Sequence, residues 1–112
     1  MSDSVTMIDV PAMQAAAAHA CALLKALGNP DRLLLLCQLT EGEHTVGELE
    51  GALGIGQPTL SQQLAVLRQE QLVATRRDGK QIYYSISSTE AMSMLQLLHS
   101  LYCPHDEGKR RD

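Results

Sequence analysis

The sequence contains no tryptophan, no phenylalanine and only three tyrosines among its 112 residues. Its core must therefore be aliphatic, built mainly from leucine, alanine, methionine and valine. Hydrophobic residues still make up 45% of the chain, which is more than disordered chains carry. The length favours a single domain. We expect one folded domain over residues 11–103, with flexible segments at 1–10 and 104–112.

The sequence also lacks the marks of export and of membrane insertion. Acidic Asp3 and Asp9 stand where a signal peptide would be basic, and Gln14 and His19 interrupt the alanine-rich stretch that follows. We find no apolar run approaching the roughly 20 residues that cross a bilayer. An odd number of cysteines, three, argues against a disulfide framework and for free thiols. These absences predict a soluble cytoplasmic protein with no membrane partner.

The formal net charge of −4 argues, at first sight, against nucleic acid as a partner. Charge distribution matters more than the total, because DNA binding depends on where the cations lie. Between residues 68 and 80 four basic side chains stand against two acidic ones, while acidic residues crowd into 41–50 and 106–107. One face of an acidic protein can therefore be basic.

Hydrophobic periodicity and turn signals predict a mainly α fold with a small β-hairpin. The predicted helices are residues 11–27, 30–40, about 45–53, a helix from about 57, and 89–102. Thr45 with Glu48 three residues later forms a capping-box pattern. Asp78-Gly79, between two alternating stretches, is a strong hairpin signal. About five helices plus a two-stranded wing, in this order, correspond to a winged helix-turn-helix.

Residue types at the helix from about 57 and at the hairpin suit DNA recognition. A recognition helix places short polar side chains in the major groove, and a wing tip places cations near phosphates. Alternatively, the polar residues of this helix simply form a solvent-exposed face without contacting DNA. The candidate DNA-binding residues are Gln57, Thr59, Ser61, Gln62, Gln63, Arg68, Arg76, Arg77 and Lys80.

Residues 26–36, and above all the continuous run from Thr45 to Tyr84, resemble the ArsR family of metal- and redox-responsive repressors. The resemblance covers nearly the whole chain. It implies a homodimer joined through the first and last helices, operator DNA as the partner, and an inducer that lowers DNA affinity. It implies no enzymatic activity.

Metal-binding relatives commonly carry a Cys-x-Cys motif before the turn, where this chain has Val46, Gly47 and Glu48. Zinc-sensing relatives use Asp and His pairs on the last helix, which here offers only Glu90 and a lone His99. A single histidine on an apolar helix is more often a packing residue than a ligand. We expect no metal site of these types and no cofactor.

Cys37 (in LLLLCQL) and Cys103 (in LYCPH) are the candidate sensing thiols. Taken alone, Cys37 fits a small hydrophobe in a core helix, and Cys103 fits an incidental surface thiol. Together they are similar to the reactive pair of the subgroup that includes the biofilm growth-associated and sulfide-responsive repressors. The run GIGQPTLSQQLAVLR is also close to that subgroup's recognition helix. The resemblance implies a response to reactive sulfur species; Cys21 lies outside the pair and is interpreted as structural.

Four alternatives remain at this point. The pair could respond to peroxide through a plain disulfide, or bind a soft metal with His105 as a third ligand. A small thiol oxidoreductase is disfavoured, since no Cys-x-x-Cys opens a helix and no strand–helix alternation is present. The winged helix could also bind protein rather than DNA, which the basic hairpin tip disfavours.

Overall fold

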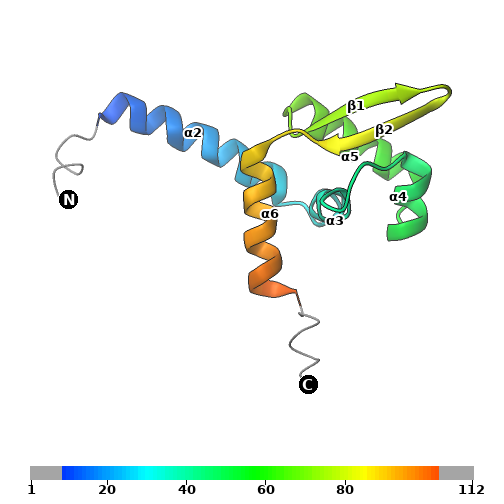
Figure 1. Ribbon diagram of the computed structural model, residues 1–112. Coiled ribbons are helices and arrows are strands. Elements are labelled where there is room, and N and C mark those ends of the chain that lie inside the picture. Colours follow the sequence, from blue (N-terminus) through cyan, green and yellow to red (C-terminus); the bar gives the residue numbers. More distant parts are fainter. Residues whose placement is uncertain (1–8, 104–112) are drawn as a thin grey trace, which may run out of the picture.

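The computed structural model describes residues 9–103. These residues form five helices and a two-stranded antiparallel hairpin, which confirms the predicted fold class (Figure 1). The elements in chain order are α2 (Val10–Leu27), α3 (Pro30–Leu39), α4 (Val46–Leu53), α5 (Gln57–Gln69), β1 (Val73–Asp78), β2 (Gln81–Ile86) and α6 (Thr89–Tyr102). Of the flexible ends that the sequence predicts, residues 1–8 and 104–112 lie outside the described residues, whereas Val10 already begins α2.

Local capping chemistry sets the ends of the central helices. Asn29 begins α3, and its side chain accepts a hydrogen bond from the Arg32 backbone N–H at 3.0 Å. Thr45 and Glu48 form the predicted capping box of α4, each side chain bonding the other's backbone N–H. Gly54 ends α4 with φ of 71°, a left-handed conformation that glycine adopts without steric cost. The tight turn into α5 therefore follows from the sequence.

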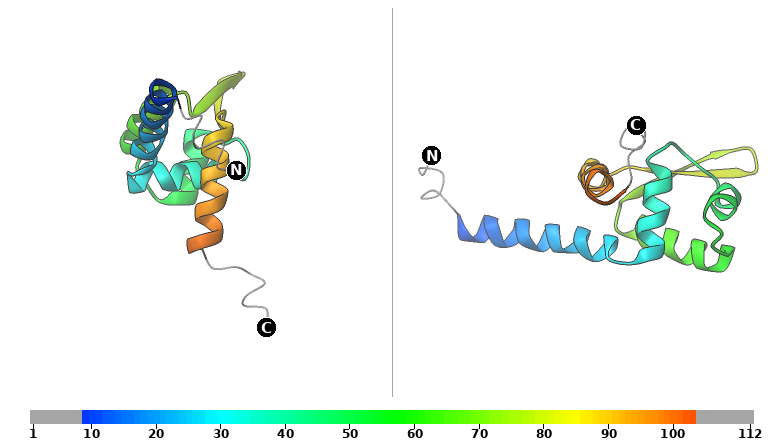
Figure 2. Two further views of the ribbon diagram at one scale, coloured as in Figure 1. Left: turned by 90° about the vertical axis from the view of Figure 1, so that its left-hand side faces the viewer. Right: turned by 90° about the horizontal axis from the view of Figure 1, so that it is seen from below.

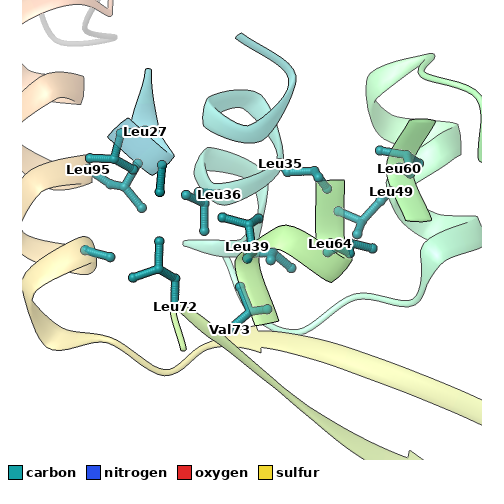
Figure 3. Close-up of a cluster of buried hydrophobic side chains, with 13 residues drawn as sticks. Leu27, Leu35, Leu36, Leu39, Leu49, Leu60, Leu64, Leu72, Val73 and Leu95 are labelled. Carbon is teal, nitrogen blue, oxygen red and sulfur yellow. The ribbon is translucent and has the colours of Figure 1, made fainter. Parts of the chain in front are cut away.

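The core is aliphatic, as the composition predicts, and Figure 3 shows its leucine side chains, with Val73 of β1, converging on one cluster. Apolar burial of this kind is the main term that stabilises a fold. The buried residues are Ala26, Leu27, Leu35, Leu36, Leu39, Leu49, Leu60, Leu64, Leu67, Leu72, Val73, Ala91 and Leu95. β2 contributes only half-buried side chains packed against this cluster, Tyr84 and Ile86.

Helix α3 is the central helix of the domain, contacting α2, α4, α5 and β2. Leu35 and Leu36 are fully buried and Leu39 nearly so. Leu34 differs from these residues, because its side chain is 49% exposed. One side of α3 therefore faces a surface groove.

The hairpin pairs Val73 with Ile86 at its base and Asp78 with Gln81 at its tip. The two turn residues are thus Gly79 and Lys80, one position later than the Asp78-Gly79 turn that the sequence suggests. Gly79 has φ of 65°, as a type II′ turn requires of its first central residue. The shift leaves Lys80 at the extreme tip.

The base of the wing is tied to the loop between α3 and α4. His44 and Tyr84 exchange backbone hydrogen bonds of 3.0 and 2.8 Å, forming an isolated antiparallel bridge. The bridge attaches one residue of the loop to β2 at Tyr84, which also pairs with Thr75 in the hairpin. The wing is therefore anchored to the helix-turn-helix through this loop.

Helix α2 projects from the domain as an arm (Figures 1 and 2). Only Ala26 and Leu27, at its C-terminal end, are buried. The Cα radius of gyration is 17.2 Å, against about 12–13 Å for a compact domain of this size. By length and composition α2 could cross a membrane, so the expectation of no such segment is wrong on that criterion. The same test is also passed by soluble helices and signal sequences.

Helix α6 carries apolar side chains on two sides, one packed against the core and one exposed. Leu95 is buried between half-buried Met92 and Leu98, while Leu97 and Leu101 are 50% and 63% exposed. Met94 also packs against the core. The last helix thus carries an uncovered apolar edge.

Replacing Leu35 by alanine should lower the free energy of unfolding by about 2–5 kcal/mol, because the cavity lies where α3 meets its neighbours. Leu34→Ala, the adjacent and half-exposed position, should cost no more than about 1 kcal/mol. Urea unfolding followed by circular dichroism measures both. Equal losses would contradict this description of the core.

Candidate nucleic-acid interface and thiol pair

Helix α5 turns its leucines inward and its short polar residues outward. Leu60, Leu64 and Leu67 are essentially fully buried. Gln57, Ser61, Gln62 and Arg68 are exposed, while Thr59 and Gln63 are half-buried. The structure therefore presents most of the predicted helix residues on an accessible surface, which DNA or solvent can reach.

The N-terminus of α5 has no side-chain cap among the described residues. Gly56 occupies the N-cap position, and Pro58 fills a first-turn position that needs no hydrogen-bond partner. The first N–H groups of a helix are unsatisfied within the helix and favour anions such as phosphate. This end of α5 is therefore suited to a phosphate contact.

Gln63 differs from the other predicted contacts, because its amide oxygen accepts a hydrogen bond from Arg32 Nη1 at 3.0 Å. Arg32 also donates through Nε to the carbonyl of Ala26 at 2.7 Å and through Nη2 to that of Lys25 at 3.2 Å. One guanidinium thus joins α3 to both α2 and α5. Gln63 is held by the protein rather than presented freely.

The wing carries three of the predicted cations, and two of them form no ion pair within residues 9–103. Arg77 and Lys80 are exposed and form no ion pair within residues 9–103. Arg68, on α5, is likewise exposed without an ion pair in that range. These three positive charges remain available to a negatively charged partner.

Arg76 is committed to Glu43 in the α3–α4 loop. Its Nε and Nη2 donate to the carboxylate in three contacts of 2.7–3.1 Å. The guanidinium also lies over the Tyr83 ring, 4.7 Å from the centroid. Hydrogen bonding to Arg76 lowers the pKa of Glu43 and raises that of the arginine. Both groups therefore stay ionised at neutral pH, and acid weakens the pair by protonating Glu43.

The two candidate thiols differ in environment. Cys37 is half-buried on α3, packed against the core, and Cys103 is exposed at the C-cap of α6. Burial raises the pKa of the Cys37 thiol, and the nearby charge of Cys103 raises it further. The fold therefore brings the two residues within electrostatic reach, although 66 positions separate them in the sequence. At neutral pH Cys37 is held in the neutral thiol form.

A groove of about 570 Å³ opens beside Cys37. It lies between α3 and α6 and reaches the end of α4. Its lining mixes apolar and polar side chains: Leu34, Cys37, Gln38, Thr40, Glu41, Leu53, Met92, Leu95, Gln96 and His99. A small molecule can therefore reach the half-buried thiol.

Cys21 is exposed on α2, so it does not pack in the core of this chain. Its interpretation as structural stays a prediction. Over the described part of the chain, no group of three or more His, Cys, Asp or Glu side chains is arranged as metal ligands. His105, the third ligand of the soft-metal alternative, lies outside the described residues.

Sequence reasoning missed Arg32 and Glu43, the partners that hold Gln63 and Arg76. Arg32 lies in the first turn of α3, where Asn29-Pro30 marks only the start of a helix. Its partner Gln63 is 31 residues away, and Glu43 is 33 residues from Arg76. No local pattern indicates such contacts.

Comparisons with known proteins agree with this geometry. Residues 29–75 match the family model described as bacterial regulatory protein, arsR family. The chain is 47% identical over 101 residues to the biofilm growth-associated repressor of Agrobacterium fabrum, covering 90% of this chain and 86% of the relative. It is 47% identical over 91 residues to the transcriptional activator HlyU of Vibrio cholerae, covering 81% and 84%. The crystal structure of the transcriptional repressor BigR from Xylella fastidiosa superposes with a TM-score of 0.78 at 46% identity, covering 88% of this chain and all of that one.

Replacing Glu43 by glutamine should free Arg76 and increase affinity for duplex DNA. One additional phosphate contact steepens the dependence of log affinity on log salt by about one unit. Fluorescence anisotropy at several salt concentrations measures both quantities. Glu41→Gln, in the same loop, makes the same charge change without touching Arg76 and should alter affinity less. If the two variants behave alike, Arg76 does not reach the DNA.

Proposed function

Since the chain is a transcriptional repressor of the ArsR family, we propose that it binds operator DNA as a homodimer and releases it in response to reactive sulfur. The sensing thiols in this proposal are Cys37 and Cys103. The observation that carries the sensing step is the position of Cys37 on the groove between α3 and α6, with Cys103 at the C-terminal end of α6. Such a regulator would act in the cytoplasm, where operator DNA is found.

The proposed DNA surface combines α5 with the wing. The exposed polar residues of α5, Gln62 above all, would read base edges, since a glutamine can pair in bidentate fashion with adenine. The uncapped N-terminus of α5 would hold a phosphate. Arg77 and Lys80 would contact the backbone beside the groove, being exposed and without ion pairs over residues 9–103. Gln63 and Arg76 enter this surface only if they leave their present partners.

Uncovered apolar side chains support a dimer through the first and last helices. Among residues 9–103, six of the eight large exposed hydrophobics lie on α2 and α6: Val10, Met13, Leu24, Leu97, Leu101 and Tyr102. Apolar surface gathered in this way marks an interaction site. A two-fold axis through these helices would place two copies of α5 on one DNA duplex.

The sensing chemistry begins at the exposed thiol. Cys103 as thiolate attacks the outer sulfur of a small persulfide, RSSH, giving Cys103–S–SH and the thiol RSH. Cys37 then attacks Cys103 at its inner sulfur, closing a disulfide and releasing hydrogen sulfide. If instead a second RSSH acts as the oxidant, the added sulfur is retained in a trisulfide, and RSH and hydrogen sulfide leave. The raised pKa of Cys37 accounts for this order of reaction.

A sulfur bridge would fasten α6 to α3. Because α6 is one of the proposed dimer helices and α3 contacts α5, the bridge would change how the two recognition helices are spaced. Half-sites on DNA recur at about one helical turn, so a small change in spacing costs much affinity. Release of the operator follows from that mismatch.

Base reading and phosphate binding can be separated with two variants. Gln62→Ala should cost about 1–3 kcal/mol of operator binding and relax sequence preference at one base pair. Arg77→Ala should weaken binding to all sequences about equally and reduce the salt dependence by about one unit. Titrations of operator and unrelated duplexes measure both. Loss of sequence preference in Arg77→Ala rather than in Gln62→Ala would contradict the assignment.

The sensing thiols are tested by treating wild type, Cys37→Ser, Cys103→Ser and, as matched control, Cys21→Ser with a low-molecular-weight persulfide. Wild type and Cys21→Ser should lose operator binding and show a bridge between residues 37 and 103 by mass spectrometry. The other two variants should keep binding. A plain disulfide that forms only with peroxide would favour peroxide as the inducer. A metal adduct would favour a soft metal. Release of DNA by both Cys37→Ser and Cys103→Ser would refute the proposal.

A further inference from the structure

We propose that Arg32 is a positioning residue that fixes the recognition helix relative to the arm helix, and thereby sets the preferred spacing of the two operator half-sites. This inference rests on the proposed operator binding by a homodimer. It assigns to Arg32 and Gln63 a role in spacing discrimination rather than in direct DNA contact. The side-chain bond between them is the only hydrogen bond between α3 and α5 side chains within residues 9–103.

The three contacts of Arg32 lead to two separate elements. Nε and Nη2 donate to the Ala26 and Lys25 carbonyls in the last turn of α2, at 2.7 and 3.2 Å. Nη1 donates to Gln63 Oε1 on α5 at 3.0 Å. The guanidinium is planar and presents its donors in a rigid fork, so the direction of one contact constrains the others. Arg32 therefore links the orientation of α2 to that of α5.

The base of the arm has few other attachments. Of the 18 residues of α2, only Ala26 and Leu27 are buried, and Leu23 is partly buried against the core. The right-hand view of Figure 2 shows α2 leaving the domain beside α3, with α5 on the far side of α3. A long helix held at one end transmits any rotation at its base to its tip. The hydrogen bonds to Lys25 and Ala26 act at that base.

The same side chain explains why Gln63 is half-buried while Gln62 is exposed. Leu60 and Leu64 anchor the inner face of α5, but leucine packing alone permits small rotations about the helix axis. A directed hydrogen bond from Arg32 to Gln63 restricts that rotation. The exposed residues of α5 are then presented at a fixed angle to the arm.

In a dimer built through α2 and α6, the angle between arm and recognition helix determines the distance between the two copies of α5. The spacing between two DNA half-sites changes in steps of one base pair. A fixed angle between the arm and the recognition helix therefore favours one spacing. A dimer in which this angle varies would bind several spacings, each with lower affinity. The predicted effect of the Arg32–Gln63 hydrogen bond is thus a higher affinity for one half-site spacing than for the neighbouring spacings, measured as the ratio of the two affinities.

The test uses the full chain and a duplex selected by the wild-type protein from random sequence, together with versions whose half-sites are one base pair closer or farther. Arg32→Met and Gln63→Met should each weaken binding to the selected spacing about tenfold, within the range typical of coupled sites. Binding to the altered spacings should fall less, so that the preference flattens. The double variant should lose no more than the larger single loss, since both changes break one link.

The spacing ratio separates positioning from general destabilisation, because a reduced folded fraction lowers every affinity alike. Ser88→Ala is the matched control: it removes the N-cap of α6, bonded to Ala91 N–H at 3.0 Å, and should leave the ratio unchanged. Gln63→Met provides the readout if Arg32→Met fails to fold. An unchanged ratio in Gln63→Met, or additive losses in the double variant, would overturn the inference alone. Failure of the wild type to select any duplex would overturn the proposed operator binding with it.

Discussion

Burial of leucine side chains around α3 is the constraint on which the rest of this structure depends. Leu35, Leu36 and Leu39 fill the centre of a core that contains no phenylalanine or tryptophan. Because α3 packs against α2, α4, α5 and β2, its remaining residues have fixed directions. Arg32 is directed to α2 and α5, and Cys37 borders the groove against α6. The proposed sensor and the proposed positioning residue therefore lie on one short, well-packed helix.

Features encoded by neighbouring residues were predictable from the sequence. The capping box at Thr45, the glycine turn at Gly54 and the inward leucines of α5 all follow from short-range rules of backbone geometry and periodicity. The hairpin was predictable as well, but its turn lies one residue later than Asp78-Gly79 suggests. The pairing of Asp78 with Gln81 settles the register, because it leaves Gly79 and Lys80 as the two turn residues.

Contacts between residues distant in the sequence could not be predicted from it. The charge pattern identified Arg76 as a cation at the wing, yet its bidentate bond to Glu43 depends on the His44–Tyr84 bridge that brings the loop beside the hairpin. The assignment of Gln63 to the DNA surface similarly overlooked Arg32. Polar periodicity distinguishes the buried face of a helix from its exposed face. It does not show which exposed side chains already form hydrogen bonds with distant residues. The pairing of Cys37 with Cys103 came from resemblance alone.

The scarcity of aromatic residues has a practical side. With no tryptophan in the chain, ultraviolet emission comes from three tyrosines, and none of them lies in the buried leucine cluster. Tyr83 lies under the Arg76 guanidinium and Tyr84 joins the wing to the loop, while Tyr102 is 80% exposed beside Cys103. The chain's own optical signal thus originates from the wing and from the end of the last helix. Spectroscopy without labels can follow the two regions where ligand and sulfur chemistry would act.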